Sequence, residues 1–466
     1  MSLTNPLAVE SIGGYLRRAP SVAPPIHAAI RVDEGIVTIA TGAGTGAGPL
    51  TTDGLAVARA NDGQPPHLTA PAVTRLYSVD TLRGLVMIVM ALDHTRDFFS
   101  NAYAFDPVDL SQTNGALFFT RWITHFCAPV FVFLAGTGAF LSVSRGKTRN
   151  GLARFLLSRG LWLVMLDLFV VHTFGWWFNV DYHLLYGDVL WALGWSMVAM
   201  AGMVFLPIWA ITAIGAAMVT LHNLLDPIHA DRFDSLRWLW AILHSGDMLE
   251  PLSGVHFIPG YPLVPWIGVM ALGYAFGNLM RLPQEKRRRT LIRLGIALTV
   301  AFVVLRATNI YGDPHGWSVQ RNLLFTIMAF LSCEKYPPSL LYLLMTLGPA
   351  IILLGLLERM PKALSSLEKS VVTLGRVPLF FYLLHIGLIH AVAVAFAYTR
   401  YGDVAWMFKN PSLPVTSAIL PFPAGYGYGL PVVYVVWLGV IVLLYPACRW
   451  FASVKNRHHN TWLSYL

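Results

Sequence analysis

The sequence predicts an all-α protein, a polytopic transmembrane helix bundle of about ten spans with both termini in the cytoplasm. Only 12% of the 466 residues are charged and 56% are hydrophobic, whereas a soluble domain carries about 25% charged residues. Apolar runs of roughly 18 residues or more recur along the chain, and such a run can cross a hydrocarbon core about 30 Å thick. Basic residues gather between these runs. Together these observations indicate a multi-pass membrane protein.

Ten apolar runs account for the predicted spans. Only Pro207 marks the turn between the fourth and fifth runs. The runs lie near residues 82–98, 118–143, 155–175, 187–206, 207–222, 262–280, 290–307, 338–357, 373–397 and 431–450.

Basic clusters set the orientation of these spans. Lys and Arg accumulate in the cytoplasmic loops of membrane proteins, and with ten spans all four clusters fall on the same side. This pattern accounts for the net charge of +9, so the charge does not indicate nucleic-acid binding. The clusters are Arg145, Lys147, Arg149 and Arg154; Arg281 and Lys286 to Arg289; Arg359, Lys362 and Lys369; and Arg449, Lys455 and Arg457.

The loops on the opposite side are longer and rich in histidine, acidic and aromatic residues. They cover residues 99–117, 176–186, 223–261, 308–337 and 398–430. We expect contact with an extracytoplasmic substrate on this side. The polar residues there include Asp106, Asp109, His183, His229, His244, His256 and His315.

Residues 1–74 differ in composition from the rest of the chain. They are rich in Ala, Gly, Pro and Thr and contain no apolar run long enough to span a membrane. Such composition is typical of linkers, and the segment lacks the basic start and apolar block of a secretory signal. We predict a poorly ordered cytoplasmic extension over 1–74, with a short strand pair within 28–41, followed by the transmembrane domain over 75–466.

Ionisable residues inside the first span are the sharpest functional signal, because they are costly at membrane depth. Asp80 and Arg83 are three residues apart and share a helix face. Asp93 and His94 follow about 15 Å further along the axis. A carboxylate beside an imidazole suits a general base. The alternative is that Asp93 and His94 only cap the helix in interfacial water.

Two further spans carry polar groups. Arg121, Trp122 and His125 lie near the outer end of the second span, and Arg121 and His125 face the same way. The ninth span contains Arg376, where a fixed cation could hold a phosphate, and then His385. Snorkelling to lipid headgroups would equally explain Arg376, and His385 could be an interior histidine with its hydrogen bonds satisfied. The three cysteines show no metal-type spacing, so we expect no metal site.

Five segments of the chain together resemble the membrane acetyltransferases typified by lysosomal heparan-alpha-glucosaminide N-acetyltransferase, and most closely their bacterial relatives. The resemblance runs from about residue 75 to the C-terminus. It is carried by Ser78–Gly84 through Asp93–His94, by His125–Gly136, by Tyr261–Gly268 through Gly273–Tyr274, by Tyr336–Ser339 through Leu347–Pro349, and by Leu374–Arg376 through His385.

A more distant resemblance is to the acyltransferase-three family, whose hallmark is an arginine, ten residues and a histidine in the first span. Arg83 and His94 have this spacing. The resemblance implies catalysis by His94 with Asp93 and His125, acetyl-CoA binding near Arg83, Arg376 and Asp80, and acceptor binding near Arg121, Trp122 and His385.

The chain departs from the lysosomal enzyme at one point. That enzyme has its active histidine in the first lumenal loop, before a Trp-Asn-Gly segment. The corresponding loop here, 99–117, lacks both, and the position matching His94 looks like an asparagine in that enzyme. The resemblance therefore does not support a heparan-type substrate.

The resulting hypothesis is an acetyltransferase of a bacterial inner membrane. It would move an acetyl group from cytoplasmic acetyl-CoA to an extracytoplasmic sugar or glycolipid, as a monomer or a homodimer within the lipid bilayer. A proton-coupled secondary transporter that uses the Asp and His residues is the first alternative, although no inverted repeat of the kind that marks such transporters is visible. A non-catalytic membrane scaffold is the second.

Overall fold

The computed structural model describes residues 31–33, 36–38, 76–102, 105–358, 365–409, 422–458 and 463. The chain divides into two compact units, Met1–Thr69 and Ala70–Leu466. The first contains an antiparallel strand pair, β1 (Arg31–Asp33) and β2 (Ile36–Thr38), inside the segment 28–41 where the sequence indicates one. The prediction of a poorly ordered extension otherwise lies outside the described residues.

The second unit is helical, which confirms the predicted fold class. Its main helices are α1 (Tyr77–Phe99), α2 (Gly115–Thr124), α3 (Cys127–Ser144), α4 (Arg149–Met165), the π-helix η1 (Leu166–Trp177), α5 (Val189–Met203), α6 (Ile208–Leu221), α8 (Leu263–Phe276), α9 (Gln284–Thr308), α10 (Leu323–Leu331), α11 (Leu340–Leu357), α12 (Ser366–Arg376), α13 (Pro378–Tyr401) and α14 (Leu430–Arg457). Shorter helices are η2 (His222–Leu225), η3 (Ala230–Leu236), α7 (Arg237–Trp240), η4 (Ala241–Ser245), η5 (Leu279–Arg281) and η6 (Ala405–Phe408).

All ten apolar runs fall on helices. Among the described residues, eight helical segments are long and apolar enough to cross a membrane. The two remaining runs lie on α1 and α5. Helix α1 carries several charged residues, and the 15 residues of α5 span only about 23 Å. The eight segments confirm a multi-pass protein, while ten crossings stay a prediction. They are Gly115–Ser144, Arg149–Trp177, Ile208–Leu225, Leu263–Arg281, Gln284–Thr308, Leu340–Leu357, Pro378–Tyr401 and Leu430–Arg457.

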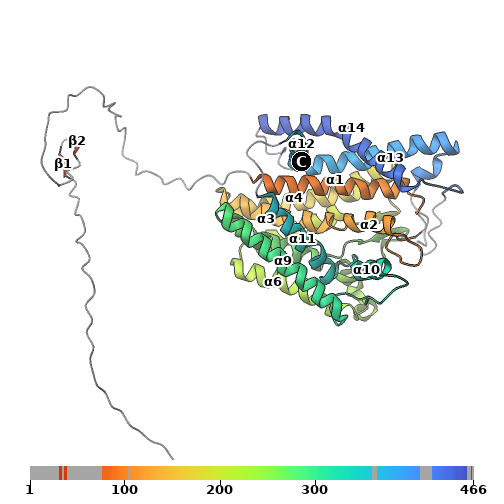
Figure 1. Ribbon diagram of the computed structural model, residues 1–466, viewed down its shortest axis with the longest axis horizontal. Coiled ribbons are helices and arrows are strands. Elements are labelled where there is room, and N and C mark those ends of the chain that lie inside the picture. The colour runs from red at the N-terminus through yellow and green to blue at the C-terminus, as the bar shows by residue number, and fades with distance from the viewer. Residues whose placement is uncertain are drawn as a thin grey trace, which may run out of the picture. The chain divides into compact units, whose positions relative to one another are not determined.

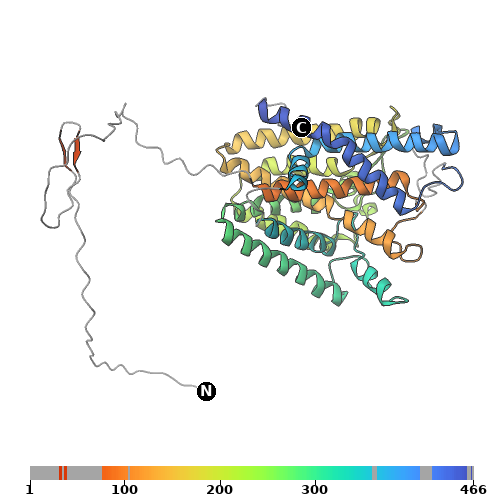
Figure 2. The same ribbon diagram turned by 45° about the horizontal axis from the view of Figure 1, so that its top comes forward.

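Helix α1 lies at the centre of the bundle and packs against α2, α3, α11, α12, α13 and α14. Figure 1 shows α13 and α14 on one side of α1 and α11 and α9 on the other. In Figure 2 the blue helix α14 and the green helix α9 again lie on opposite sides of the bundle. The polar residues of α1 therefore face protein on several sides.

Glycines allow the closest helix contacts. A methyl group on Gly375 of α12 would overlap the carbonyl oxygen of Asp80, and one on Gly84 of α1 would overlap that of Val371. In lipid the hydrophobic effect does not drive helices together, so their association depends on close packing. Small residues permit this close approach of the backbones. Other glycine pairs of this kind are Gly136 and Gly273 (α3 and α8), Gly160 and Gly194 (α4 and α5), Gly215 and Gly268 (α6 and α8), and Gly295 and Gly348 (α9 and α11).

We call one end of the bundle the basic end, because the chain turns that join α3 to α4 and α8 to α9 carry two of the predicted basic clusters there. A buried Glu358 after α11 joins three elements at this end. It accepts a hydrogen bond of 2.5 Å from Ser78 of α1 and pairs with Arg287 of α9. The first turn of α1 is thereby fixed at the basic end, and the C-terminus of α1 lies at the opposite end, which we call the loop end.

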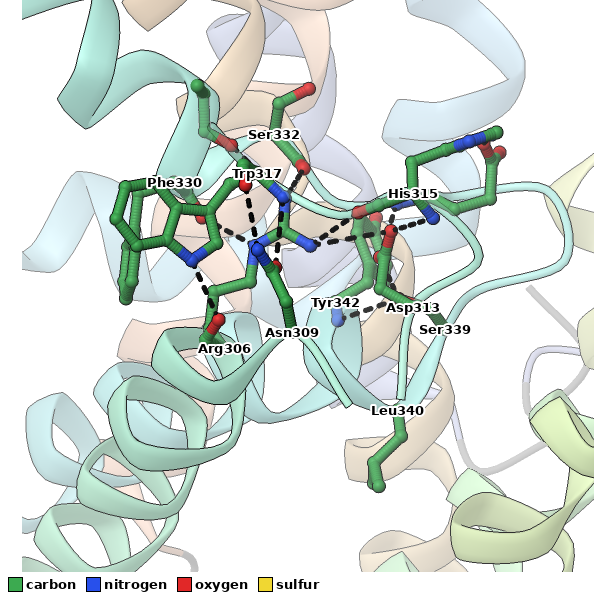
Figure 3. A network of polar contacts seen from close by, with 12 residues as sticks. Arg306, Asn309, Asp313, His315, Trp317, Phe330, Ser332, Ser339, Leu340 and Tyr342 are labelled. Atoms are coloured by element: carbon green, nitrogen blue, oxygen red, sulfur yellow. Dashed lines mark hydrogen bonds and ion pairs between the residues drawn. The ribbon is translucent and has the colours of Figure 1, made fainter. Parts of the chain in front are cut away.

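At the loop end, buried Arg306 of α9 organises the segment between α9 and α11 (Figure 3). Its guanidinium donates hydrogen bonds to the carbonyl oxygens of His315, Phe330 and Ser332 at 2.7, 3.0 and 2.5 Å. It also lies 3.5 Å from Asp313, which accepts from the Ser339 hydroxyl at 2.7 Å. These bonds satisfy the carbonyl groups of a loop that would otherwise be left buried without partners.

A three-stranded sheet covers part of the loop end. Strand β5 (Val255–Ile258) lies between β3 (Leu184–Tyr186), to which it is parallel, and β4 (Leu249–Leu252), to which it is antiparallel. In the register Leu185 lies opposite Phe257. The sheet thereby holds the chain that follows η1 against the chain that precedes α8.

Replacing Gly375 with alanine should destabilise the protein, because the new methyl group forces α12 away from α1. Overpacking of this kind costs about 1–3 kcal/mol. Thermal unfolding in detergent, followed by tryptophan fluorescence, should show a lower midpoint. Gly439→Ala on α14 is the matched control, because a methyl group there meets no atom within 4 Å. Equal midpoints for the two variants would contradict close α1–α12 packing.

Candidate active site between two cavities

Asp93 of α1 lies between two buried arginines. Its carboxylate accepts from Arg121 of α2 at 2.5 Å and from Arg96 of its own helix at 3.2 Å, and Arg96 also pairs with Asp97 at 2.5 Å. The side chains of Asp93, Arg96 and Arg121 are only 14, 8 and 13% exposed. A charge removed from water needs such partners. This ion cluster therefore ties α2 to α1.

His94 faces a different set of neighbours. Its ring lies 5.1 Å from that of His385 on α13 and 5.2 Å from Trp176 of η1, measured between ring centroids. Its Nδ1 is 3.6 Å from a carboxylate oxygen of Asp97. The structure thus brings His94, Asp93, Arg121 and His385 into one region at the loop-end half of α1.

The tautomer of neutral His385 follows from its contacts. Its Nδ1–H donates to the carbonyl oxygens of Tyr382 at 2.6 Å and Phe381 at 3.2 Å. Nε2 of neutral His385 is therefore unprotonated, and it is buried without a hydrogen-bond partner among the described residues. Such a nitrogen can accept a proton or a hydrogen bond.

Six aromatic rings contact one another in a continuous row that includes His94, whose own contacts are edge-on with Trp176 and tilted with His385. Phe98 stacks on Trp176 at 5.5 Å and on His390 at 4.9 Å, and His390 stacks on Phe178 at 4.1 Å. His390 also donates from Nδ1–H to the carbonyl oxygen of Gly175 at 3.0 Å. We call His385, His94, Trp176, Phe98, His390 and Phe178 the ring column.

Two other predicted site residues lie elsewhere. The indole N–H of Trp122 points to the sulfur of Met345 at 3.3 Å, and its ring packs edge-on against Phe119 and Phe126. These contacts join α2 to α11. His125 packs against Tyr342 at 5.4 Å and interacts electrostatically with Arg121 and Asp93. It therefore borders the ion cluster, and no contact between His125 and His94 is found among the described residues.

Asp80, Arg83 and Arg376 meet at the basic end. Arg83 lies 3.4 Å from Asp80 and donates to the carbonyl oxygen of Gly375 at 3.2 Å, and Arg376 lies 3.8 Å from Asp80. The close approach of α1 and α12 through Gly84 and Gly375 brings these side chains together. The structure therefore groups the three residues near which the resemblance implies acetyl-CoA binding, and that role stays a prediction.

A cavity of about 370 Å³ opens among these residues, and we call it the basic-end cavity. Arg83, Arg159, Arg376 and Lys455 give it four cationic side chains, and the rest of its lining is mainly apolar. Along α1 it extends from Arg83 to Met90, about 10 Å. Met90 and His94 are one turn apart on the same helix face, and Tyr382 in the cavity wall contacts His385 at 5.4 Å. The deep end of this cavity therefore adjoins the ring column.

A second cavity of about 320 Å³ lies beside η1 and the start of α5, and we call it the aromatic cavity. It shares Trp176 with the ring column and includes Asp167 and Asp188. Its full lining is Asp167, Val171, His172, Trp176, Trp177, Leu184, Tyr186, Asp188 and Ile258.

A third cavity, of about 410 Å³, collects several polar loop residues, including His229, His244 and His315. Within it His244 pairs with Asp226 at 3.1 Å. Burial raises the pKa of Asp226, but hydrogen bonds from His244 and Asn223 outweigh burial and leave that pKa below its ordinary value. Among the described residues no group of His, Cys, Asp or Glu side chains is arranged to hold a metal ion.

Three charged residues near the candidate site are not found by the sequence analysis. Buried Lys335 interacts electrostatically with Asp93, His125 and Asp188. Lys335 and Asp188 lie in loops, and only the fold brings them close to α1. Asp167 could have been singled out from the sequence, because a carboxylate within the apolar run 155–175 is costly at membrane depth and indicates a functional role.

The fold and the site define a polytopic membrane protein with buried histidines and charges close to two cavities. Residues 75–311 match the family described as heparan-alpha-glucosaminide N-acetyltransferase, catalytic. The matched segment has 237 residues (311 − 75 + 1) of the 466 in the chain. The chain belongs to this family, and the match supports a membrane acetyltransferase. No curated protein matches the chain.

Replacing Asp93 with asparagine should destabilise the protein strongly, because Arg96 and Arg121 then stay buried without a full counter-charge. Breaking a buried pair costs about 3–5 kcal/mol. The free energy of unfolding, measured by denaturant titration in detergent, should fall accordingly. Arg289→Gln is the control, because its pair with Glu285 is exposed and such pairs contribute about 0–1 kcal/mol. Similar losses in both variants would refute a special role for the Asp93 cluster.

Proposed function

We propose that this protein transfers an acetyl group from cytoplasmic acetyl-CoA to an acceptor on the opposite side of the membrane, a sugar or glycolipid of the cell envelope. The observation that carries the proposal is that two cavities adjoin the ring column, the basic-end cavity near Met90 and Tyr382 and the aromatic cavity at Trp176. The basic-end cavity has four cationic side chains, and the rest of its lining is mainly apolar. The membership of the family supplies the acetyl chemistry.

The basic-end cavity fits the parts of acetyl-CoA in order. Arg83, Arg159, Arg376 and Lys455 would hold the phosphates, for which guanidinium groups are well suited. The pantetheine arm would lie along the apolar lining formed by α1, α3, α4, α5 and α13. The thioester would then reach the deep end, near Met90 and Tyr382, within one helical turn of His94.

The proposed chemical step is a direct transfer. The acceptor oxygen or nitrogen attacks the thioester carbonyl carbon while His94 removes the proton of that O–H or N–H group. The C–S bond breaks, and the leaving CoA thiolate takes up the proton from the His94 imidazolium. The cationic Arg121 and Lys335, which interact with Asp93 next to His94 in the chain, would favour the negative charge that develops on the thioester oxygen. A covalent acetyl-His94 intermediate is the other route compatible with these residues.

Acetyl-CoA should bind to the detergent-purified protein in a calorimetric titration. Arg376→Gln and Arg159→Gln should each weaken binding about tenfold or more, because a hydrogen bond to a charged group contributes about 1.5–3 kcal/mol. S-acetylpantetheine lacks the nucleotide phosphates, so its affinity should not change in these variants. Arg281→Gln, at the same end but outside the cavity lining, should bind acetyl-CoA normally. Absence of acetyl-CoA binding by the unmodified chain would exclude the proposed function.

His94→Ala should retain acetyl-CoA binding and lose acetyl transfer and thioester hydrolysis. Binding should be retained because His94 does not belong to the proposed phosphate-binding residues. Activity should be lost because His94 supplies the base, and loss of general-base catalysis typically lowers a rate by about 10²–10⁴. Release of CoA can be followed with a thiol reagent. Unchanged release by this variant would remove His94 from the mechanism.

The transporter alternative has a separate test in proteoliposomes without CoA. It predicts solute flux under a proton gradient.

A further inference from the structure

Helix α9 carries a row of three basic residues along one face of its first turns. Lys286, Arg289 and Arg293 are spaced by three and four residues, so they lie on one side of the helix. All three are exposed, and the row extends over about 10 Å of the helix axis. Within α9 the single acidic residue is Glu285, which pairs with Arg288 and Arg289 at 3.0 and 3.1 Å. We call Lys286, Arg289 and Arg293 the basic row.

The same face of α9 continues as a row of exposed apolar residues. Ile296 and Val300 follow Arg293 at spacings of three and four residues, and Val303 and Val304 extend the row. These four apolar residues are 47–56% exposed. In a bilayer they lie among acyl chains, and the basic row lies next to them at the level of the headgroups. Helix α9 therefore presents positive charge and apolar surface in the order of a phospholipid's headgroup and chains.

The opposite face of α9 holds the basic row outwards. Arg287 on that face pairs with the buried Glu358. Gly295 packs so closely on α11 that a methyl group there would overlap the carbonyl oxygen of Gly348. The extensive contacts of α9 within the described part of the chain are with α11 and η5, and Figure 2 shows α9 along an outer edge of the bundle. The face with the basic row is thus turned towards lipid.

A second copy of the chain would fit this face poorly. In a two-fold dimer whose axis runs along the membrane normal, the same patch of both copies meets. The basic row of one copy would then face the basic row of the other, and like charges at close range repel. Charge complementarity favours an anionic occupant.

We propose that the outer face of α9 binds a phospholipid whose headgroup carries two phosphates. Basic residues beside a transmembrane helix attract anionic headgroups, and the basic row would hold the phosphates by charge-assisted hydrogen bonds. Three cations exceed the charge of a single phosphodiester, so two phosphates match them better than one. The acyl chains pack along Ile296 and Val300. The N-terminus of α9 adds to the attraction, because no side chain caps its N–H groups and a helix N-terminus carries partial positive charge.

The test follows thermal unfolding of the full chain in detergent, with and without added lipid. Cardiolipin has two phosphates and phosphatidylglycerol one, so the two are compared at equal total phosphate, with phosphatidylcholine as the lipid without net charge. Cardiolipin should raise the unfolding midpoint most, because a ligand that binds the folded state stabilises it. Inorganic phosphate has no acyl chains and should not reproduce the effect. No shift with cardiolipin, or an equal shift with phosphatidylglycerol or inorganic phosphate, would overturn the inference.

A combined variant removes the basic row: Lys286→Gln, Arg289→Gln and Arg293→Gln. Its affinity for cardiolipin, measured by native mass spectrometry, should fall about tenfold or more, because each basic residue contributes to the binding of anionic lipid. Arg293→Gln alone tests the same row if the combined variant does not fold, and it should also bind cardiolipin more weakly. Wild-type affinity in the folded variant would contradict the proposed site.

The matched control removes the same amount of charge from exposed residues elsewhere at the basic end: Arg145→Gln, Arg149→Gln and Arg154→Gln. Arg145 precedes α4, and Arg149 and Arg154 are five residues apart, so these three do not form a row on one helix face. The control should keep the cardiolipin affinity of the unmodified chain. Equal losses in both combined variants would show attraction by net charge alone and would overturn the inference.

Two further measurements on the same samples separate the remaining outcomes. Light scattering gives the oligomeric state, and a dimer that is lost only in the basic-row variant, without any effect of cardiolipin, would assign this face to a second copy and overturn the inference. The basic row does not line the basic-end cavity, so acetyl-CoA should bind the basic-row variant with unchanged affinity. Weaker acetyl-CoA binding by that variant would contradict a separate lipid site, whereas absence of acetyl-CoA binding by the unmodified chain would leave the lipid site standing.

Discussion

The need to balance charge inside an apolar bundle determines the arrangement around α1. Asp93 cannot be buried alone, so it holds Arg96 and Arg121, and through Arg121 it fixes the end of α2 against α1. Because an α-helix has 3.6 residues per turn, the next residue, His94, points in a different direction, towards α13 and η1. The two adjacent residues therefore have different surroundings, a carboxylate paired with arginines and an imidazole among aromatic rings.

Much of this arrangement can be predicted from local spacing. The Asp80 and Arg83 pair follows from a separation of three on one helix, and Asp93 and His94 are conspicuous because ionisable groups are rare at membrane depth. Arg376 was expected to hold a phosphate because of its residue type; it lies 3.8 Å from Asp80, and its phosphate role stays a prediction. Basic clusters between apolar runs also indicated which helix ends lie together.

The remainder depends on tertiary contacts that a single sequence does not contain. Lys335 belongs to a loop that the Arg306 network folds towards Asp93, and no local pattern predicts that path. The π-helix changes which side chains share a face, so the spacing of Asp167 and Trp176 cannot be interpreted with α-helical periodicity. Trp122 was assigned to substrate binding from its neighbours in the chain, but its indole lies among Phe119, Phe126 and Met345. Its assignment to substrate binding stays a prediction.

The ring column has a consequence for the membrane itself. His94, Trp176, Phe98, His390 and their neighbours pack ring against ring, so this part of the bundle consists of side chains of low polarity. Moving an ion out of water into such surroundings is costly. If the protein carries an acetyl group across the bilayer as proposed, these rings would help it to do so without opening a path for ions.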